Sequence, residues 1–263
     1  MTEPLHAPQG APCWVTLLVP RLEAAQHFYG ELLGWRYRPG SQKLGHYMVA
    51  LAEGVPVAGL GELQEGLRGF TAWTPYFAAD SVDVATQRVR ERGATVAVGP
   101  VGFGSGRVAW AADPAGAVFG VWEGGTAPGW RVGGRLNAPA WLELQTGDAF
   151  AAALFYGEVF GWDRADPERY DIRYEHDRVI LRIDGRTVAG LSGGAVAGAA
   201  DPRLRPHWHV HFCVGDVEET AAKAVSLGAE VVSAPAGSPL GRGLLALVRD
   251  PQGALFSIET AAP

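Results

Sequence analysis

The fold of this 263-residue chain is decided by a stretch that occurs twice. Residues 28–35 read FYGELLGW, and residues 155–162 read FYGEVFGW. Trp14 and Trp141, which open the two copies, precede these stretches by the same distance, so the copies align without a gap. A repeat of this size indicates an internal duplication and predicts two domains of one fold.

A second motif recurs near the end of each half. Residues 113–119 read DPAGAVF, and residues 250–256 read DPQGALF. Asp-Pro-x-Gly is typical of a tight turn between two strands. The repeats predict a first domain at residues 1–124, a linker rich in Gly, Pro and Ala at 125–138, and a second domain at 139–263.

Each half divides again into two similar units. In the first half, a short apolar strand at 14–19 precedes a helix at 21–33, which Gly34 ends. Strand-like pieces follow at 35–38, 46–52 and 55–60. The pattern restarts at Thr74, and the further helices are predicted at 82–92, 149–160 and 217–227. The chain therefore reads as an α+β protein with four β-α-β-β-β units paired into two tandem domains. The Phe-Tyr pairs of the repeated stretch lie at helical spacing and are expected in the core.

Composition excludes several classes of function. Hydrophobic residues make up 48% and charged residues 19%, a globular balance. A net charge of −6 gives no electrostatic support for binding nucleic acid or an anionic membrane. The sequence shows no signal peptide or apolar run of membrane-spanning length. Cys13 and Cys213 lie in apolar, strand-like runs, which favours free thiols and a cytoplasmic protein.

These motifs resemble the vicinal oxygen chelate superfamily, which includes glyoxalase I, extradiol dioxygenases and bleomycin-resistance proteins. The Pro-Cys-Trp opening at 12–14 and the His-Trp-His-Val run at 207–210 resemble a two-domain, glyoxalase-like branch from actinobacteria. The resemblance implies that each domain is a curved mixed sheet, forming a cup with its helices outside. It also implies that members with catalytic activity usually hold one divalent metal inside the cup.

The first-strand and last-strand ligand positions implied by this resemblance have lost their ligands. The first-strand histidine falls on Trp14 and Trp141, and an indole cannot ligate a metal. The last-strand glutamate falls on Gly120 and Ser257. Neither of these residues is a useful ligand, so the last strands supply no carboxylate.

The remaining family positions retain at most one ligand. The carboxylate near the end of the first unit falls within 58–60 and 189–191, which contain no acid. The histidine of the second unit's first strand falls on Thr74 in the first half and on His209 in the second. No cofactor is therefore expected.

The second half nevertheless carries a candidate polar site. His209 and His211 lie on one face of a strand, and Trp141 and Glu143 share a face of another. In the family fold these strands lie close together, so we expect Glu143, His209 and His211 to meet. They would form a divalent-metal site, a general acid–base pair, or a hydrogen-bonded cluster without chemistry. Thr16 and Tyr76 stand at matching positions of the first half, so the fold itself does not require the cluster.

The first half instead has an aromatic cup. Trp14, Tyr76 and Trp122 face inward by strand parity, which suits either a flat ligand or an ordinary filled core. The sequence thus favours a metal-free protein that binds an apolar or aromatic metabolite. The predicted binding residues are Trp14, Thr16, Tyr76, Trp122, Trp141 and Ser257, with Glu143, His209 and His211 as catalytic candidates.

Two other classes of function remain open. The alternative is an isomerase, lyase or cyclase, metal-free or metal-dependent, in which Glu143 or His209 acts as the base. An interaction module with degenerate cups is also consistent with the sequence. Both a monomer and a homodimer are compatible with it.

Overall fold

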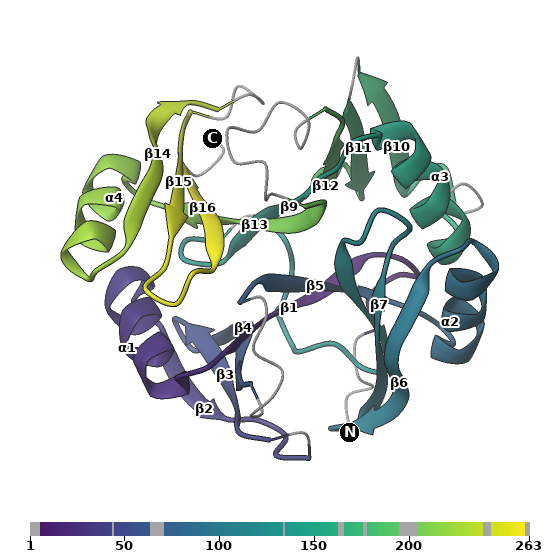
Figure 1. The fold of residues 1–263 in the computed structure, drawn as a ribbon, viewed down its shortest axis with the longest axis horizontal. Coiled ribbons are helices and arrows are strands. Elements are labelled where there is room, and N and C mark those ends of the chain that lie inside the picture. The colour runs from purple at the N-terminus through teal and green to yellow at the C-terminus, as the bar shows by residue number, and fades with distance from the viewer. Residues whose placement is uncertain are drawn as a thin grey trace. The chain divides into compact units, whose positions relative to one another are not determined.

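The computed structural model describes residues 6–43, 45–63, 71–133, 135–162, 166–175, 178–194, 205–238 and 243–260. Within these ranges, sixteen strands and four helices repeat the order β-α-β-β-β four times (Figure 1). The predicted α+β class is confirmed. The first half contains β1 (Pro12–Val19), α1 (Leu22–Leu33), β2 (Arg36–Pro39), β3 (Tyr47–Ala52), β4 (Val55–Glu62), β5 (Trp73–Ala78), α2 (Val82–Glu91), β6 (Thr95–Phe103), β7 (Gly106–Ala112) and β8 (Val118–Glu123).

The second half repeats this order. It contains β9 (Pro139–Gln145), α3 (Ala149–Phe160), β10 (Tyr170–Glu175), β11 (Arg178–Ile183), β12 (Arg186–Ser192), β13 (His207–Val214), α4 (Val217–Ser226), β14 (Glu230–Gly237), β15 (Leu244–Arg249) and β16 (Leu255–Thr260). β6 and β14 run further than their sequences predict. Each pairs with the following strand through irregular register shifts, so pairing continues where the local pattern breaks.

Each sequence half forms one eight-stranded mixed sheet. The strand orders are β2-β3-β4-β1-β5-β8-β7-β6 and β10-β11-β12-β9-β13-β16-β15-β14. β1 pairs with β4, β5 with β8, β9 with β12 and β13 with β16 in parallel. Equivalent strands thus hold equivalent places in the two sheets.

Side chains along the first strand of each half alternate between the apolar core and the opposite face of the sheet. On β9, Leu142 and Leu144 are fully buried, whereas Trp141, Glu143 and Gln145 point to the opposite face. We call this second surface the polar face of β9. β1 alternates in the same way.

The helices begin and end as their sequences dictate. α1 and α3 end at Gly34 (φ 67°) and Gly161 (φ 74°), the left-handed conformation in which glycine is favoured. α2, α3 and α4 begin at Ser81, Asp148 and Asp216, whose side chains accept hydrogen bonds from backbone N–H groups of the first turn.

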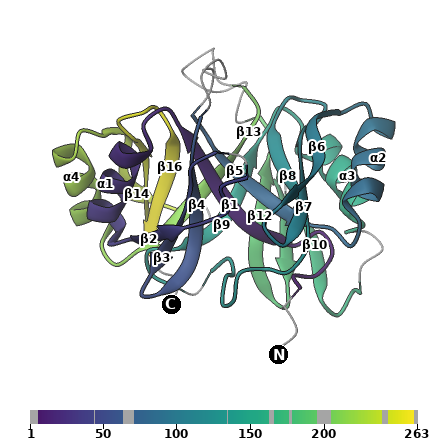
Figure 2. The same cartoon turned by 90° about the horizontal axis from the view of Figure 1, so that it is seen from below.

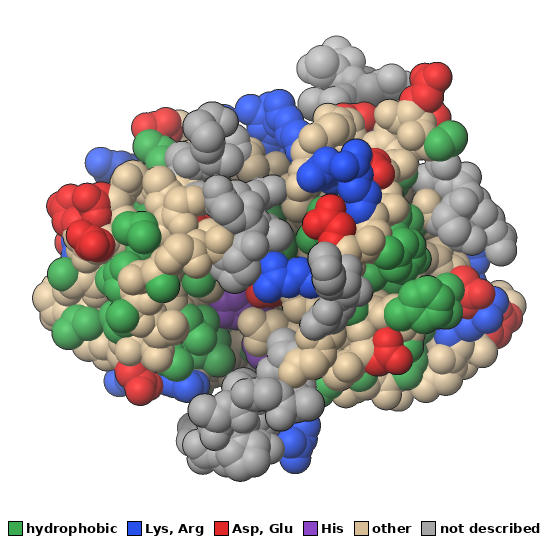
Figure 3. Space-filling model, turned by 90° about the horizontal axis from the view of Figure 1, so that it is seen from above, with side chains coloured by type: hydrophobic (Ala, Val, Ile, Leu, Met, Phe, Trp, Pro, Cys, Tyr) green, Lys and Arg blue, Asp and Glu red, His purple; other side chains and the backbone are tan. Residues whose placement is uncertain are grey.

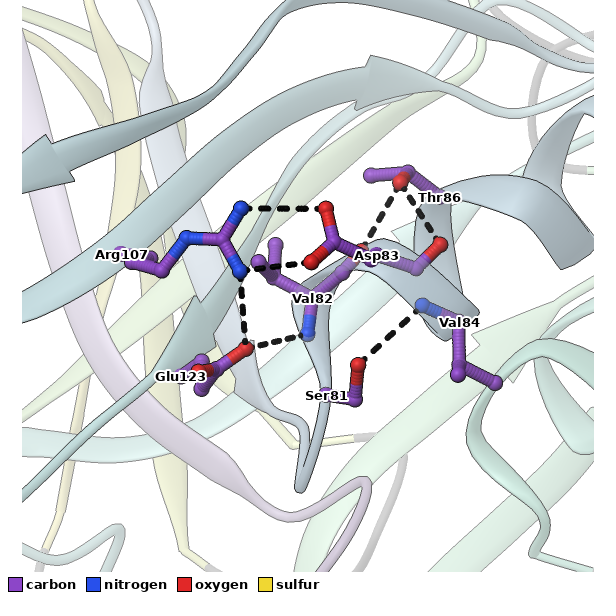
Figure 4. A network of polar contacts seen from close by, with 7 residues as sticks. All are labelled: Ser81, Val82, Asp83, Val84, Thr86, Arg107 and Glu123. Carbon is purple, nitrogen blue, oxygen red and sulfur yellow. Dashed lines mark hydrogen bonds and ion pairs between the residues drawn. The ribbon is translucent and has the colours of Figure 1, made fainter.

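Hydrogen bonds and ion pairs connect the start of α2 to two strands, β7 and β8 (Figure 4). Arg107 on β7 donates two hydrogen bonds to Asp83, at 2.6 and 3.0 Å. Glu123 on β8 accepts a hydrogen bond from the Val82 N–H at 2.8 Å and lies 3.7 Å from Arg107. The ion pairs are exposed, so they orient this corner more than they stabilise it.

The chain packs into two compact units, and each unit combines parts of both sequence halves. Unit 1 comprises Met1–Cys13, Thr74–Ala127 and Trp141–Trp208, and unit 2 comprises Trp14–Trp73, Pro128–Ala140 and His209–Pro263. Within unit 1, α2 lies beside α3 (Figure 2), and within unit 2, α1 lies beside α4 (Figure 1). The boundaries 1–124, 125–138 and 139–263 describe the sequence repeat and stay a prediction as domain limits.

In unit 2, the two repeated motifs bind each other. The Tyr29 hydroxyl of the first half donates a hydrogen bond to Asp250 Oδ2 of the second half at 2.9 Å. Trp73 Nε1 donates to the Tyr29 oxygen at 3.2 Å, and the Trp35 ring stacks on Tyr29 with centroids 5.4 Å apart. Burial raises the pKa of Tyr29, so the phenol remains a donor.

Unit 1 contains the equivalent hydrogen bonds, with the tyrosine supplied by the second half and the aspartate by the first. Tyr156 of the second half donates to Asp113 Oδ2 of the first half at 3.0 Å, and Trp208 Nε1 donates to the Tyr156 oxygen at 2.9 Å. The Trp162 ring stacks on Tyr156 at 5.9 Å. The motifs that reveal the duplication are therefore also the ones that join the two halves.

The residues just before each half's first strand are held in the same reciprocal way. Trp162 Nε1 donates to the Gly10 carbonyl at 2.9 Å, and Trp35 Nε1 donates to the Asn137 carbonyl at 2.7 Å. Gly10 (φ 76°) and Asn137 (φ 57°) are both left-handed, a conformation that these two residue types tolerate best. Both tryptophans that donate these bonds stand directly after the glycine that ends a helix.

No helix among the described residues is long and apolar enough to span a bilayer. On the face shown in Figure 3, the coloured basic side chains lie among acidic and apolar ones and form no continuous basic surface.

Tyr29→Phe and Tyr156→Phe should each lower the free energy of unfolding by about 1–3 kcal/mol, because each change leaves a buried carboxylate oxygen and a buried indole N–H without their partner. Chemical denaturation of the full chain checks this. Tyr174→Phe is the control, since Tyr174 is 57% exposed and the change should cost little. Wild-type stability in both Tyr29→Phe and Tyr156→Phe would show that these hydroxyls do not stabilise the contact between the two halves.

Candidate functional site

Unit 2 contains a buried cluster of four polar side chains on two neighbouring parallel strands. β13 supplies His209 and His211, and β16 supplies Ser257 and Glu259, each about 2% exposed. His209 Nε2 lies 2.9 Å from Ser257 Oγ, and His211 Nδ1 lies 3.6 Å from Glu259 Oε2. The imidazole rings meet edge to face, with centroids 5.1 Å apart. We call these four residues the histidine cluster.

The histidine cluster has the chemistry for proton exchange. An imidazole within hydrogen-bond distance of a hydroxyl either donates to it or accepts its proton. A second imidazole lies beside a carboxylate, so an acid–base pair stands next to the first contact. Burial, followed by the negative charge of Glu259, raises the pKa of the Cys213 thiol to about 11, so this cysteine is not a reactive thiolate.

Glu259 was missed by reasoning from the sequence. The family resemblance places the metal-binding glutamate at the position of Ser257, and the acidic residue two positions later was not considered. The available signal was strand parity, because Glu259 lies two residues after Ser257 and therefore on the same face of β16.

Unit 1 carries a second polar group, on the polar face of β9. Ser192 Oγ on β12 donates to Glu143 Oε1 at 2.6 Å, and Gln145 Nε2 lies 3.4 Å from Glu143 Oε2. Glu143 is half-buried, whereas Ser192 is buried. We call Glu143, Gln145 and Ser192 the Glu143 cluster. Gln145 and Ser192 are absent from the sequence prediction.

An aromatic group surrounds the β1 residues in unit 2. Trp14 Nε1 donates to Tyr47 Oη at 2.8 Å, and Thr16 Oγ1 lies 3.0 Å from the same oxygen. The Trp130 ring lies 6.0 Å from Trp14 and is held by a 2.8 Å hydrogen bond to the Val57 carbonyl. Burial raises the pKa of Tyr47, which keeps its phenol protonated. Tyr47 and Trp130 were not predicted, although Gly59, which leaves room for the Tyr47 ring, was a usable signal.

A smaller aromatic group lies in unit 1. Trp110 Nε1 donates to Tyr76 Oη at 2.8 Å, and the Tyr76 ring covers Gly120. Trp122, two residues after Gly120, lies on the same face of β8 and donates to the Gly125 carbonyl at 3.2 Å. Tyr76 and Trp122 therefore lie on one face of the paired strands β5 and β8, and their inward orientation stays a prediction.

The structure joins some of the predicted site residues. His209, His211 and Ser257 form one cluster, and Trp14 and Thr16 share the Tyr47 hydroxyl. Glu143 and Trp141 lie on one face in unit 1, whereas the two histidines belong to unit 2. The predicted meeting of Glu143 with His209 and His211 therefore stays a prediction.

Aromatic side chains stand against three glycines at the positions where the family resemblance places metal ligands. A side chain at Gly59 or Gly120 would collide with the Tyr47 hydroxyl or the Tyr76 ring, and a Cβ at Gly190 would lie 2.7 Å from the Trp141 ring. Rings thus occupy the space that ligands would need. In the part of the chain that the structure describes, no group of three or more His, Cys, Asp or Glu side chains has an arrangement that could hold a metal.

The fold and these strand-borne groups define a class of protein. Four β-α-β-β-β units in two eight-stranded mixed sheets form the vicinal oxygen chelate fold. Residues 141–259 match the family model described as a glyoxalase-like domain. The chain belongs to the glyoxalase-like proteins of the vicinal oxygen chelate superfamily.

Curated relatives match almost the whole chain. An anthracycline biosynthesis protein, DnrV of Streptomyces peucetius, is 36% identical over 95% of this chain and 92% of its own length. CFP32 of Mycobacterium tuberculosis is 33% identical over 97% of this chain and 96% of its own length. Both matches cover at least 95% of this chain and therefore extend across both of its repeats.

Solved structures match the fold at low sequence identity. The Mn(II)-bound glyoxalase of Novosphingobium aromaticivorans has a TM-score of 0.63 and 17% identity, covering 97% of this chain and 83% of its own. The 2,3-dioxygenase LapB of Pseudomonas sp. KL28 has a TM-score of 0.63 and 13% identity, covering 98% and 94%. They establish the fold alone.

Gly120→Ala should destabilise the chain by about 1–3 kcal/mol, because the added methyl overlaps the Tyr76 ring and forces repacking. Gly147→Ala is the matched control, since a Cβ there meets nothing within 4 Å. Thermal unfolding of both variants measures the difference. Equal midpoints would show that the position tolerates a side chain, and the argument against a ligand at this position would fail.

Proposed function

We propose that this protein binds a flat, apolar or aromatic small molecule and uses no metal at the family's ligand positions. The aromatic group of Trp14, Tyr47 and Trp130 would stack against the ligand. Binding tolerates the loss of metal ligands, whereas the metal-assisted chemistry of the superfamily does not.

The observation that supports this proposal is the fixed orientation and partial exposure of the Trp14 ring. Its N–H already donates to Tyr47, and Thr16 contacts the same hydroxyl, so the indole is fixed in orientation. Trp14, Tyr47 and Trp130 are each only partly buried. A fixed, partly exposed aromatic surface offers a ligand stacking area at low entropic cost.

The relatives favour the same ligand class. The name of the 36%-identical relative places it in anthracycline biosynthesis. Anthracyclines contain a fused, planar ring system, which is the shape that stacking aromatic side chains select.

Trp14→Ala should weaken binding of 9-anthracenemethanol, a neutral flat probe, by about tenfold or more, because roughly 1.4 kcal/mol of stacking corresponds to a factor of ten. Fluorescence titration of the full chain measures the dissociation constant. Tyr47→Phe should also weaken binding, since it releases the Trp14 ring from its hydrogen bond.

Phe150→Ala is the control for this titration. Phe150 lies 58% exposed on α3, so the change removes an aromatic ring outside the proposed site. Wild-type affinity in Trp14→Ala, or an equal loss in Phe150→Ala, would show that the ligand does not stack on Trp14.

A second candidate function rests on the histidine cluster. The 2.9 Å contact between His209 and Ser257, together with Glu259 beside His211, suits proton transfer in an isomerase, lyase or cyclase. In such an enzyme, Glu259→Gln or His209→Ala would abolish turnover while leaving ligand affinity nearly unchanged. A binding protein would show an altered affinity and no turnover to lose.

A further inference from the structure

Strand β10 forms an outer edge of its sheet and differs in sequence from the other edge strands. Within the described residues, the sheet orders place β2, β6, β10 and β14 at the edges. Three of these strands contain a proline, namely Pro39 in β2, Pro100 in β6 and Pro235 in β14. Proline lacks the N–H that pairing with a further strand needs, and natural sheets use it to protect their edges. β10, which reads YDIRYE, contains none.

The backbone of β10 has hydrogen-bonding groups on its outer side. The Asp184 N–H donates to the Arg169 carbonyl at 2.8 Å, and β10 and β11 continue from there in an unbroken antiparallel register. In an antiparallel pair, successive residues direct their backbone groups alternately toward the partner strand and away from it. Every second residue from Arg169 onward therefore faces β11, whereas Ile172 and Tyr174 direct their N–H and C=O groups outward.

An exposed apolar surface adjoins this edge. Figure 1 shows α3 beside β10. Phe150 on α3 is 58% exposed and Tyr174 on β10 is 57% exposed, and their ring centroids lie 5.9 Å apart. Leu154, one helical turn after Phe150, is 50% exposed. We call Phe150, Leu154 and Tyr174 the β10 patch. Adjoining apolar side chains on a surface are typical of a site that binds another protein.

The first half shows that the fold does not require the apolar residues of α3. The repeated stretches align without a gap, so Phe150 and Leu154 correspond to Glu23 and His27 on α1. Both of these α1 residues are exposed. The same helix surface is thus polar in the first half and apolar in the second. It is apolar in the half whose edge strand β10 has no proline.

The charges on β10 favour pairing with a second copy of the same strand. In an antiparallel pair with a two-fold axis at Ile172, each Ile172 stands opposite its equivalent and Asp171 stands opposite Arg173 of the second copy. Opposite charges directly across an antiparallel pair stabilise it. The two side chains already attract each other within one chain, where Arg173 Nε lies 2.8 Å from Asp171 Oδ2.

Other registers of the same pair are less favourable. A two-fold axis at Arg173 would set Arg173 against itself and Asp171 against Glu175, and like charges directly opposite each other are destabilising. An axis at Tyr174 would set Arg173 against Glu175 but would leave the first part of the strand outside the pair. The axis at Ile172 therefore combines opposite charges with the longest pairing of Tyr170–Glu175.

We propose that this protein forms a homodimer in which the β10 strands of two copies pair in antiparallel order about a two-fold axis at Ile172. Each Ile172 N–H would donate to the Ile172 carbonyl of the second copy. The sheets of the two copies would join into one continuous sheet, and the two β10 patches would cover each other. The inference goes beyond the proposed ligand binding and does not depend on it.

Sedimentation velocity of the full chain over a range of concentrations tests the dimer. The wild type should be dimeric. Asp171→Arg should raise the dissociation constant about tenfold or more, because it sets like charges opposite each other on both sides of the axis. The double change Asp171→Arg with Arg173→Asp restores opposite charges and should return the affinity to within about threefold of wild type.

Glu230→Arg is the matched control for the charge reversal. Glu230 is also an acidic residue on an edge strand, β14, and also belongs to an exposed ion pair, with Arg249. Its reversal should leave the dimer unchanged.

Two further variants test the backbone pairing and the apolar contact. Ile172→Pro removes an outward N–H and should abolish the dimer. Phe150→Glu with Leu154→His gives α3 the residues that α1 carries, and it should weaken the dimer about tenfold or more because apolar burial is lost. Circular dichroism checks that each variant keeps its fold.

Three outcomes would contradict the proposal. A wild type that stays monomeric up to its solubility limit would overturn it and leave the edge to a strand of a different protein. A dimer that survives both Asp171→Arg and Ile172→Pro, or that Glu230→Arg weakens equally, would show that the contact does not lie on β10. A dimer weakened by Asp171→Arg and not restored by the double change would overturn the register centred on Ile172.

Discussion

Two buried tyrosine–aspartate hydrogen bonds hold this molecule together. Tyr29 binds Asp250, and Tyr156 binds Asp113, at 2.9 and 3.0 Å. Each bond joins the helix of one half to the Asp-Pro turn of the other. Because the aspartate oxygens are buried, loss of either tyrosine hydroxyl within the folded chain leaves a buried polar atom without its partner. Each compact unit is therefore built from residues of both sequence halves.

The hydrogen bonds between the halves leave the first strands, β1 and β9, and their parallel partners, β4 and β12, available for function. The helices, the turns and the tryptophans after the capping glycines carry the structural bonds. The site faces differ between the halves, since Thr16 and Leu18 in one correspond to Glu143 and Gln145 in the other. Duplication thus preserved a scaffold while the chemistry of its two copies diverged.

Much of the fold was predictable because its signals are local. Helical spacing and the capping glycines Gly34 and Gly161 fixed α1 and α3 to within a residue. The reciprocal pairing of Tyr and Asp was not predictable, because no local pattern says which half's turn a tyrosine will meet. Tyr47 and Trp130 were missed for the same reason, since Tyr47 reaches Trp14 from β3, with β4 between the two strands, and Trp130 reaches it from the predicted linker.

We propose that aromatic side chains in this protein occupy space that metal ligands take in other members of the superfamily. Elemental analysis of the untagged chain, purified without chelator and then incubated with Mn(II), tests this proposal. We expect far less than one metal ion per chain both before and after incubation. Near-stoichiometric iron, manganese, zinc or nickel would contradict this proposal and would direct attention to the histidine cluster, His209, His211 and Glu259, as the source of ligands.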